Sequence, residues 1–205
     1  MIFFLVFLFL TYPITAINSQ FQPSQKLAIA AIALTKDRVT YDPVYRKIGY
    51  PNGDVPPDKG VCTDVIIRAY RKLGIDLQKE VHLDMQKNFS KYPSKWGLKK
   101  PDTNIDHRRV PNLQVFFSRF GKVKPVTSDP SDYSPGDIVT WMLPGSLPHI
   151  GIVVHRKSKD GKRPLIVHNV GRGQVLEDFL FKYPITGHYT YQKEKDAVFE
   201  LPPKS

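Results

Sequence analysis

The chain has 205 residues, of which 41% are hydrophobic, and a formal net charge of +11 at pH 7. This length suits one domain with a substantial core, and the hydrophobic content excludes a chain that is disordered throughout. The basic excess favours an anionic partner, and the absence of a recognisable nucleic-acid-binding module argues against nucleic acid as that partner.

The N-terminal segment is apolar over residues 2–10 and then turns small and polar around residues 16–19. This pattern predicts a signal peptide over residues 1–19, although Lys and Arg are missing from its first positions. An uncleaved anchor and a buried helix are the alternatives, because the run is short for a membrane-spanning helix. We expect an exported monomer, periplasmic or secreted, with a single domain over residues 20–205 and no stable membrane span once the leader is cleaved.

Helical patterns occupy much of the first half of the chain. Apolar residues recur at helical spacing in residues 24–37, 62–73, 79–89 and 111–120, and glycines just past the second and fourth segments favour helix ends there. A stretch rich in proline and glycine, residues 41–60, predicts a loop.

Strand patterns dominate after residue 122. Short β-branched or aromatic runs lie at residues 136–142, 149–155, 164–170 and 187–192, bounded by proline and glycine clusters. Helices followed by antiparallel strands predict an α+β domain in which N-terminal helices pack on a small antiparallel sheet.

Cys62 is the only cysteine of the chain, and it stands at the start of a predicted helix. Cysteines of exported proteins usually pair, so a lone one is either buried and inert or needed as a thiol. The first turn of a helix has free N–H groups and a positive dipole end, which both stabilise a thiolate. We therefore expect Cys62 to be an accessible nucleophile with a low pKa.

Two histidines lie on adjacent predicted strands and could supply the base that a thiol nucleophile needs. His149 begins the run "HIGIVV", and His168 lies in "LIVHNVG". If Ile150 faces the core, His149 and Gly151 face the other way and leave room for a substrate or a helix terminus. Either histidine alone could equally be a hydrogen-bonded core residue, but the pair and a lone cysteine together form a constellation.

Several motifs resemble known families. The runs "GVCTDVIIRAYRKLGIDL", "SPGDIVTW", "HIGIVV" and "IVHNVGRGQVLED" occur in the order found in the NlpC-type cell-wall cysteine peptidases, across residues 60–178. The runs "YPNGDVP", "DTNIDHRRVPNL" and "ITGHY" resemble more closely an exported bacterial family known as domain of unknown function 1287. The resemblance implies a papain-like, NlpC-type fold.

The resemblance also implies catalytic roles. Cys62 would be the nucleophile, His149 the general base and later the acid, and His168 the residue that orients His149. Asn169 is the alternative orienting residue, but it stands where the strand should end and is expected to serve a turn. Tyr50 and Asp64 are candidates for further contacts at the site.

The loop over residues 91–109 ends in "NIDHRR". Arginine forks bind carboxylates, and the peptides of the bacterial cell wall carry carboxylates. The alternative is an internal network of ion pairs that holds the loop. We expect the internal role for Asp106 and a substrate-binding role for Arg108 or Arg109, with His107 beside them.

The predicted function is a cysteine amidase or endopeptidase that hydrolyses peptidoglycan peptides through a thiol-acyl intermediate. Its partner would be peptidoglycan or another anionic cell-wall polymer. A non-catalytic wall-binding protein and a thiol acyltransferase remain alternatives. No metal or other cofactor is expected, because the sequence has no His-Glu-x-x-His motif and no pair of cysteines or histidines at metal-binding spacing.

Overall fold

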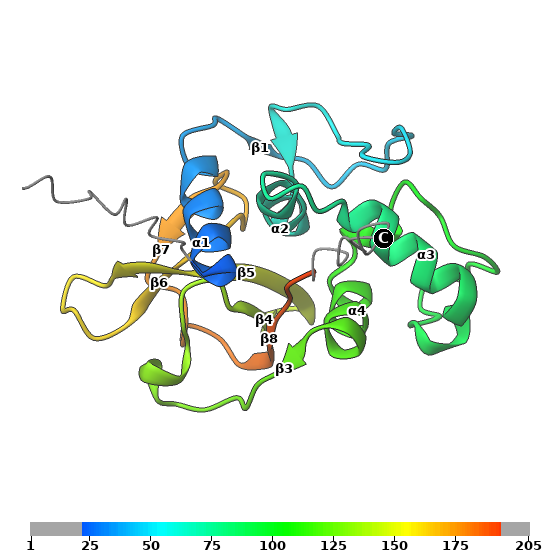
Figure 1. Cartoon of the computed structure of the whole chain (residues 1–205). Helices are drawn as coiled ribbons and strands as arrows, with labels where there is room; N and C mark the ends of the chain where they lie inside the picture. The colour runs from blue at the N-terminus through cyan, green and yellow to red at the C-terminus, as the bar shows by residue number, and fades with distance from the viewer. Residues whose placement is uncertain (1–21, 194–205) are drawn as a thin grey trace, which may run out of the picture.

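The computed structural model describes residues 22–193, which form four α-helices and a six-stranded antiparallel sheet (Figure 1). The expected α+β class is confirmed, because helices fill the first half of the described chain and the long strands fill the second. The predicted signal peptide, residues 1–19, lies outside the described residues.

The four helices begin where the sequence offers a start signal. Proline occupies a first-turn position of the first and fourth helices, where its missing N–H costs nothing. Asp76 caps the third helix by accepting a hydrogen bond from the Lys79 N–H, so this helix begins earlier than the predicted residue 79. The helices are α1 (Pro23–Leu34), α2 (Cys62–Arg71), α3 (Leu77–Asn88) and α4 (Val110–Phe120), with short 3-10 turns η1 (Phe89–Lys91), η2 (Asp106–Arg108) and η3 (Pro130–Asp132).

The main sheet has the strand order β3-β8-β4-β5-β6-β7, and every neighbouring pair is antiparallel. The four strands predicted from the sequence correspond to β4, β5, β6 and β8. The others are too short to give a periodic signal, including the separate parallel pair of β1 and β2. The strands are β1 (Thr40–Tyr41), β2 (Lys59–Gly60), β3 (Lys122–Val123), β4 (Ile138–Leu143), β5 (Leu147–Lys157), β6 (Pro164–His168), β7 (Val175–Glu177) and β8 (Ile185–Thr190).

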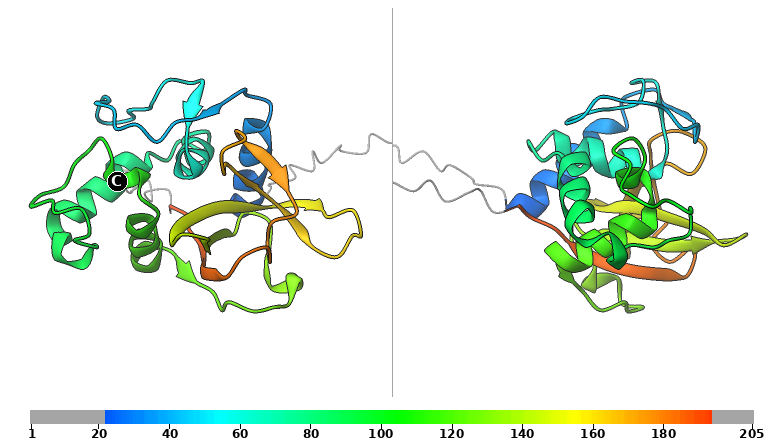
Figure 2. Two further views of the ribbon diagram at one scale, coloured as in Figure 1. Left: turned by 180° about the vertical axis from the view of Figure 1, so that it is seen from behind. Right: turned by 90° about the vertical axis from the view of Figure 1, so that its right-hand side faces the viewer.

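Both faces of the sheet are covered. Ile150 and Ile152 of β5 belong to one apolar cluster with α1, α2 and α4, and Figures 1 and 2 show these helices gathered on the same side of the sheet. Trp141 and Val153 point into a second cluster, with Phe179. The side-chain alternation expected for β5 is therefore present, but its second face is also buried.

The Gly-Asp pair of "SPGD" precedes β4, and its two residues contact α1 and β8 respectively. Gly136 has φ +92°, and its backbone lies so close to that of Ser24 that a Cβ would clash. The Asp137 carboxylate faces His188 Nε2 at 2.7 Å and accepts a 2.6 Å hydrogen bond from Lys124 Nζ. These contacts give His188 a structural position in the fold.

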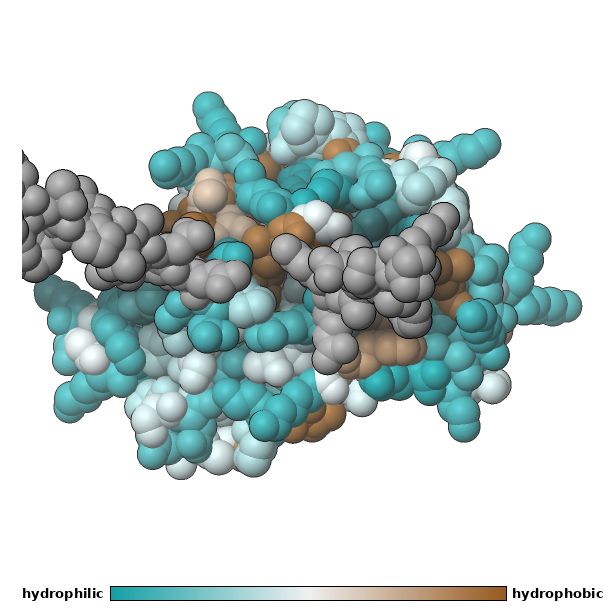
Figure 3. Space-filling view, viewed as in Figure 1, coloured by the Kyte–Doolittle hydropathy of each residue, from teal (hydrophilic) through white to brown (hydrophobic). Residues whose placement is uncertain are grey.

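The face of the molecule seen in Figure 1 is mainly hydrophilic, with small separate apolar areas (Figure 3). Within residues 22–193, no helix has the length and apolar character needed to cross a membrane.

Candidate active site

Cys62 is the first residue of α2, and its side chain lies in the boundary between this helix and β5. The residue is 6% exposed and belongs to the same apolar cluster as Ile150. Val61, which precedes it, is extended, and its N–H donates a 2.7 Å hydrogen bond to Asp64 in the first turn of the helix. The predicted placement of the thiol at a helix start is confirmed, whereas the predicted accessibility is wrong.

His149 and His168 are in direct contact. The Nε2 atom of His149 lies 2.9 Å from the Nδ1 atom of His168, so one of the two carries the shared proton. The rings meet nearly edge to face and pack against Phe179. His168, and not Asn169, is therefore the neighbour of His149.

Gly151 makes this contact between strands possible. A Cβ on Gly151 would lie 2.6 Å from the Cγ2 atom of Ile166 and 3.2 Å from the Cβ atom of His168. The sequence analysis predicted that the space beside His149 would hold a substrate or a helix terminus. That prediction is wrong, because β6 fills the space. The glycine lets β6 bring His168 against His149.

Asn169 has a different role. Its Oδ1 atom accepts a 3.1 Å hydrogen bond from the Gly171 N–H, and its amide nitrogen donates to the Gly60 carbonyl oxygen at 3.2 Å. It therefore serves the turn after β6, as predicted, and also ties this turn to the segment that leads into Cys62.

The thiol contacts β5 at the residue that follows His149, and neither His149 nor His168 lines the cavity beside Cys62. The backbone N–H of Ile150, the residue after His149, faces the Cys62 sulfur. Among the hydrogen bonds of residues 22–193, none joins the thiol to either ring, and Nδ1 of His149 makes none at all. That nitrogen is therefore free to take a proton, and catalytic hydrogen bonds often tighten only when substrate is bound.

Burial sets the charge state of all three groups. Burial, and second the nearby Asp64 carboxylate, raise the pKa of the Cys62 thiol to about 12, although the N–H groups of Ile150, Thr63 and Cys62 itself oppose the rise. Burial and then His168 lower the pKa of His149 to about 3. Burial, then Lys182 and Arg172, lower the pKa of His168 to about 4. A resting pair of neutral thiol and neutral imidazole replaces the thiolate expected from the helix dipole alone.

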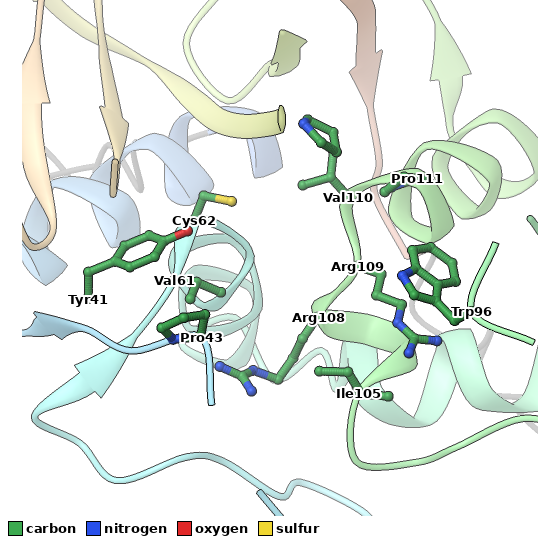
Figure 4. A pocket seen from close by; sticks show the side chains of 11 residues that line it. Tyr41, Pro43, Val61, Cys62, Trp96, Ile105, Arg108, Arg109, Val110 and Pro111 are labelled. Atoms are coloured by element: carbon green, nitrogen blue, oxygen red, sulfur yellow. The ribbon is translucent and has the colours of Figure 1, made fainter. Parts of the chain in front are cut away.

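A cavity of about 240 Å³ opens beside Cys62 (Figure 4). Tyr41 of β1 turns its hydroxyl toward Cys62, while Arg109 and Trp96 stand across the hollow from them. The wall combines apolar side chains with the guanidinium of Arg109, which suits a ligand that is part apolar and part anionic. The lining residues are Tyr41, Pro43, Val61, Cys62, Trp96, Ile105, Arg108, Arg109, Val110, Pro111 and Pro148.

Arg108 and Asp64 bind each other. The Arg108 guanidinium donates two hydrogen bonds of 2.9 Å to the Asp64 carboxylate, and the two side chains are 2% and 3% exposed. Thr63 adds a third link, because its hydroxyl donates to the Arg108 carbonyl oxygen at 3.0 Å. The guanidinium of Arg108 and the Asp64 carboxylate therefore fix η2 to the first turn of α2, and the structure does not offer them to a substrate.

Arg109 is the arginine that faces the cavity. Its guanidinium lies over the Trp96 ring at 4.0 Å from the centroid and reaches the Asp106 carboxylate at 3.2 Å. Asp106 also accepts a hydrogen bond from the Asp102 N–H, which agrees with the internal role expected for it.

Two further predicted contacts lie elsewhere. His107 is buried and is not in the cavity wall, and burial lowers its pKa to about 3. Tyr50 packs edge to face on His82, with 5.0 Å between the ring centroids, and is likewise absent from the wall. Arg108, the residue after His107 on η2, does line the cavity, so the position of the His107 side chain on this short turn keeps it out of the wall, and sequence distance could not reveal this.

Tyr41 and Trp96 are cavity residues that the sequence analysis missed. Both lie in segments without periodicity, so only the pairing of β1 with β2 and the packing of Arg109 on Trp96 place them at the site. Residues 22–193 contain no cluster of three or more His, Cys, Asp or Glu side chains that could hold a metal ion.

Comparison with known proteins gives similarities of three kinds: to a family model, to a protein sequence and to a solved structure. A family model described as "Domain of unknown function (DUF1287)" matches residues 28–191. The uncharacterized protein YijF of Escherichia coli (strain K12) is 53% identical over 174 residues, which is 84% of each chain. The structure of NlpC1 from Trichomonas vaginalis is similar with a TM-score of 0.46 and 17% identity over 85% of this chain, which spans about half (47%) of that one.

Proposed function

The chain belongs to the DUF1287 family, and we propose that it is a cysteine hydrolase, an amidase or endopeptidase that cleaves amide bonds in peptides of the bacterial cell wall. One observation carries the proposal. A lone thiol at the start of a helix lines a cavity, and the strand beside it supplies a histidine whose Nε2 is bound to a second histidine.

Acylation uses the free nitrogen of His149. As substrate closes the cavity, the Cys62 proton passes to Nδ1 of His149 and the sulfur attacks the amide carbon. The 2.9 Å contact with His168 holds the ring of the imidazolium in place while it carries the extra proton. Nδ1–H then protonates the leaving amine, the C–N bond breaks, and a thioester on Cys62 remains.

Tyr41 is placed to stabilise the oxyanion of this step. Its hydroxyl points toward Cys62 in Figure 4. Partial desolvation, and second the proximity of Cys62 and Asp64, raise the pKa of Tyr41, so the hydroxyl keeps its proton and can donate. The backbone N–H of Cys62 is a second donor for the same oxygen.

Deacylation reverses the proton path. His149 takes a proton from water through Nδ1, the hydroxide oxygen attacks the thioester carbon, and the thiolate leaves and regains a proton from the imidazolium. A carboxylic acid and a free amine are the products, so no redox partner is needed.

Charge supports an anionic wall peptide as substrate. The chain carries a net charge of +11, and Arg109 gives the cavity a guanidinium wall. Arginine favours carboxylates, which wall peptides carry. Export would bring the protein to the wall, and we propose a leader cleaved between about residues 16 and 24, by the small-residue rule. Intact-mass analysis of the exported protein tests this, and a chain that retains Met1 would instead be anchored.

Digestion of isolated sacculi tests the proposed function. Wild-type protein should release peptide fragments that mass spectrometry identifies by a new carboxylate and a new amine. Cys62→Ala and His149→Ala should release none, whereas His155→Ala, which removes an exposed histidine from the same strand, should match wild type. Binding to sacculi without any release would support a wall-binding protein, and new amide products formed with added amines would support an acyltransferase.

A further inference from the structure

Glu177 of β7 lies behind the histidine pair. Strand β7 pairs with β6 so that His168 is opposite Val175 and Ile166 is opposite Glu177. The Oε2 atom of Glu177 comes within 3.4 Å of Nε2 of His168, on the side of the ring away from His149. The carboxylate is partly buried, at 21% exposed, whereas the histidine side chain is fully buried.

The Nε2 atom of His168 needs a partner. It is buried and makes no hydrogen bond within residues 22–193. A buried polar nitrogen left without a partner costs free energy, and buried groups of this kind are almost always satisfied. The 3.4 Å separation is longer than a good hydrogen bond, so a movement of a few tenths of an ångström would complete it.

The surroundings of His168 keep its ring neutral, so the ring has one N–H proton, on either of its two nitrogens. Arg172 and Lys182 are the cations that act on this ring, and Glu177 is the anion beside it. Both cations oppose an imidazolium, as burial does, and His149 offers only a shared proton. A neutral ring carries a single N–H, either at Nδ1 or at Nε2.

We infer that Glu177 is a positioning residue that fixes the tautomers of both histidines. A carboxylate can only accept, so it holds the His168 proton on Nε2 and leaves Nδ1 of His168 as an acceptor. The 2.9 Å contact then requires His149 to donate from Nε2. Nδ1 of His149 is consequently unprotonated, as the proposed function, on which this inference rests, requires of its base.

The opposite tautomers would block the reaction. If His168 carried its proton on Nδ1, it would donate to Nε2 of His149, and the neutral His149 ring would carry its own proton on Nδ1. That nitrogen could not then accept the Cys62 proton. Arg172 binds the other oxygen of Glu177 and so keeps the carboxylate turned toward His168.

Nitrogen-15 spectra of histidine-labelled protein near neutral pH test the inference without any substrate. In the wild type, both rings should show a protonated Nε2 and an unprotonated Nδ1. Glu177→Ala should shift both rings toward protonated Nδ1, and hydrolysis should fall by at least about tenfold, since a base in the wrong tautomer is inactive. Glu177→Gln should give the same shift, because Arg172 holds the amide oxygen and the amide NH2 then faces Nε2 of His168 as a donor.

The neighbouring Asp178→Ala variant is the matched control, because Asp178 pairs with Arg163 on the surface and should leave both tautomers unchanged. The His188 signals report an intact fold. Wild-type tautomers in Glu177→Ala with unchanged His188 signals would overturn the inference even if the protein hydrolyses wall peptide. The expected tautomer shift in a protein that hydrolyses nothing would uphold the positioning by Glu177 and refute the proposed function.

Discussion

Arg108 donates two hydrogen bonds of 2.9 Å to Asp64, and both side chains are almost fully buried. This pair joins the turn that carries Arg109 to the turn that carries Cys62. The pair supports the cavity wall but is itself buried. Its loss should therefore reduce the stability of the fold more than it directly reduces catalysis.

Arg108→Gln should therefore lower the free energy of unfolding by about 3–5 kcal/mol, because it leaves the Asp64 carboxylate buried without its counterion. Urea denaturation measures the loss. Replacing both partners by apolar residues, Asp64→Leu with Arg108→Met, should recover most of it. The control Arg163→Gln, from an exposed ion pair, should cost at most about 1 kcal/mol. A small loss in Arg108→Gln together with lost activity would return Arg108 to a substrate-binding role.

The role of Tyr41 as an oxyanion donor can be tested with Tyr50 as a matched control. Tyr41→Phe should lower kcat by about a hundredfold or more with little change in KM, because it removes a donor that acts in the transition state. Tyr50→Phe should leave both constants near wild type, since its ring packs on His82 away from the cavity. Steady-state rates on a released wall peptide decide between them, and the reverse order of effects would contradict the placement of Tyr41.

The thiol of the free protein should react slowly. Because burial raises the pKa of Cys62 to about 12, its thiolate fraction at neutral pH is far below that of a free cysteine. Iodoacetamide should alkylate it at least about tenfold more slowly than a model thiol, at a rate that still rises above about pH 9. Rapid alkylation with a plateau at mildly acidic pH would instead show the thiolate expected from the helix dipole alone.

Acid should destabilise the fold before the carboxylates titrate. The pKa values of His107 and His149 are lowered to about 3 and that of His168 to about 4, against an ordinary 6.5. Below about pH 6.5 the unfolded chain therefore binds more protons than the folded chain. The free energy of unfolding decreases as the pH is lowered, by up to about 1.4 kcal/mol per pH unit for each histidine.

Urea unfolding at a series of pH values between about 4.5 and 7 measures this slope. His107→Gln should reduce the slope by the share of one group without touching the histidine pair at the site. Stability that stays constant over this range would mean that these rings are not held neutral by the fold.

The sequence predicted the parts of the site that obey a period or a helix start. Cys62 lies at the beginning of a helix, and His149 and His168 lie on adjacent strands, because hydrophobic alternation and helical spacing are local signals. The second covered face of the sheet was not predicted, since Trp141 and Phe179 are brought over His149 only by tertiary packing.

Electrostatics and loop contacts could not be predicted from the sequence in the same way. The helix start argued for a thiolate, but the burial of Cys62 and the proximity of Asp64 outweigh it. Glu177 and Tyr41 lie in strands of three and two residues, too short to show alternation, and they reach the site through pairing with β6 and β2.

Detection of a thioester on Cys62 tests thiol catalysis most directly, because slow alkylation alone would equally fit a cysteine without a catalytic role. Protein mixed with a soluble wall peptide and quenched in acid should show, by mass spectrometry, the acyl part of that peptide attached to Cys62. The adduct should be absent from Cys62→Ala, which should also release no product. Product formed by the wild type without any adduct, and formed equally by Cys62→Ala, would contradict thiol catalysis at this site.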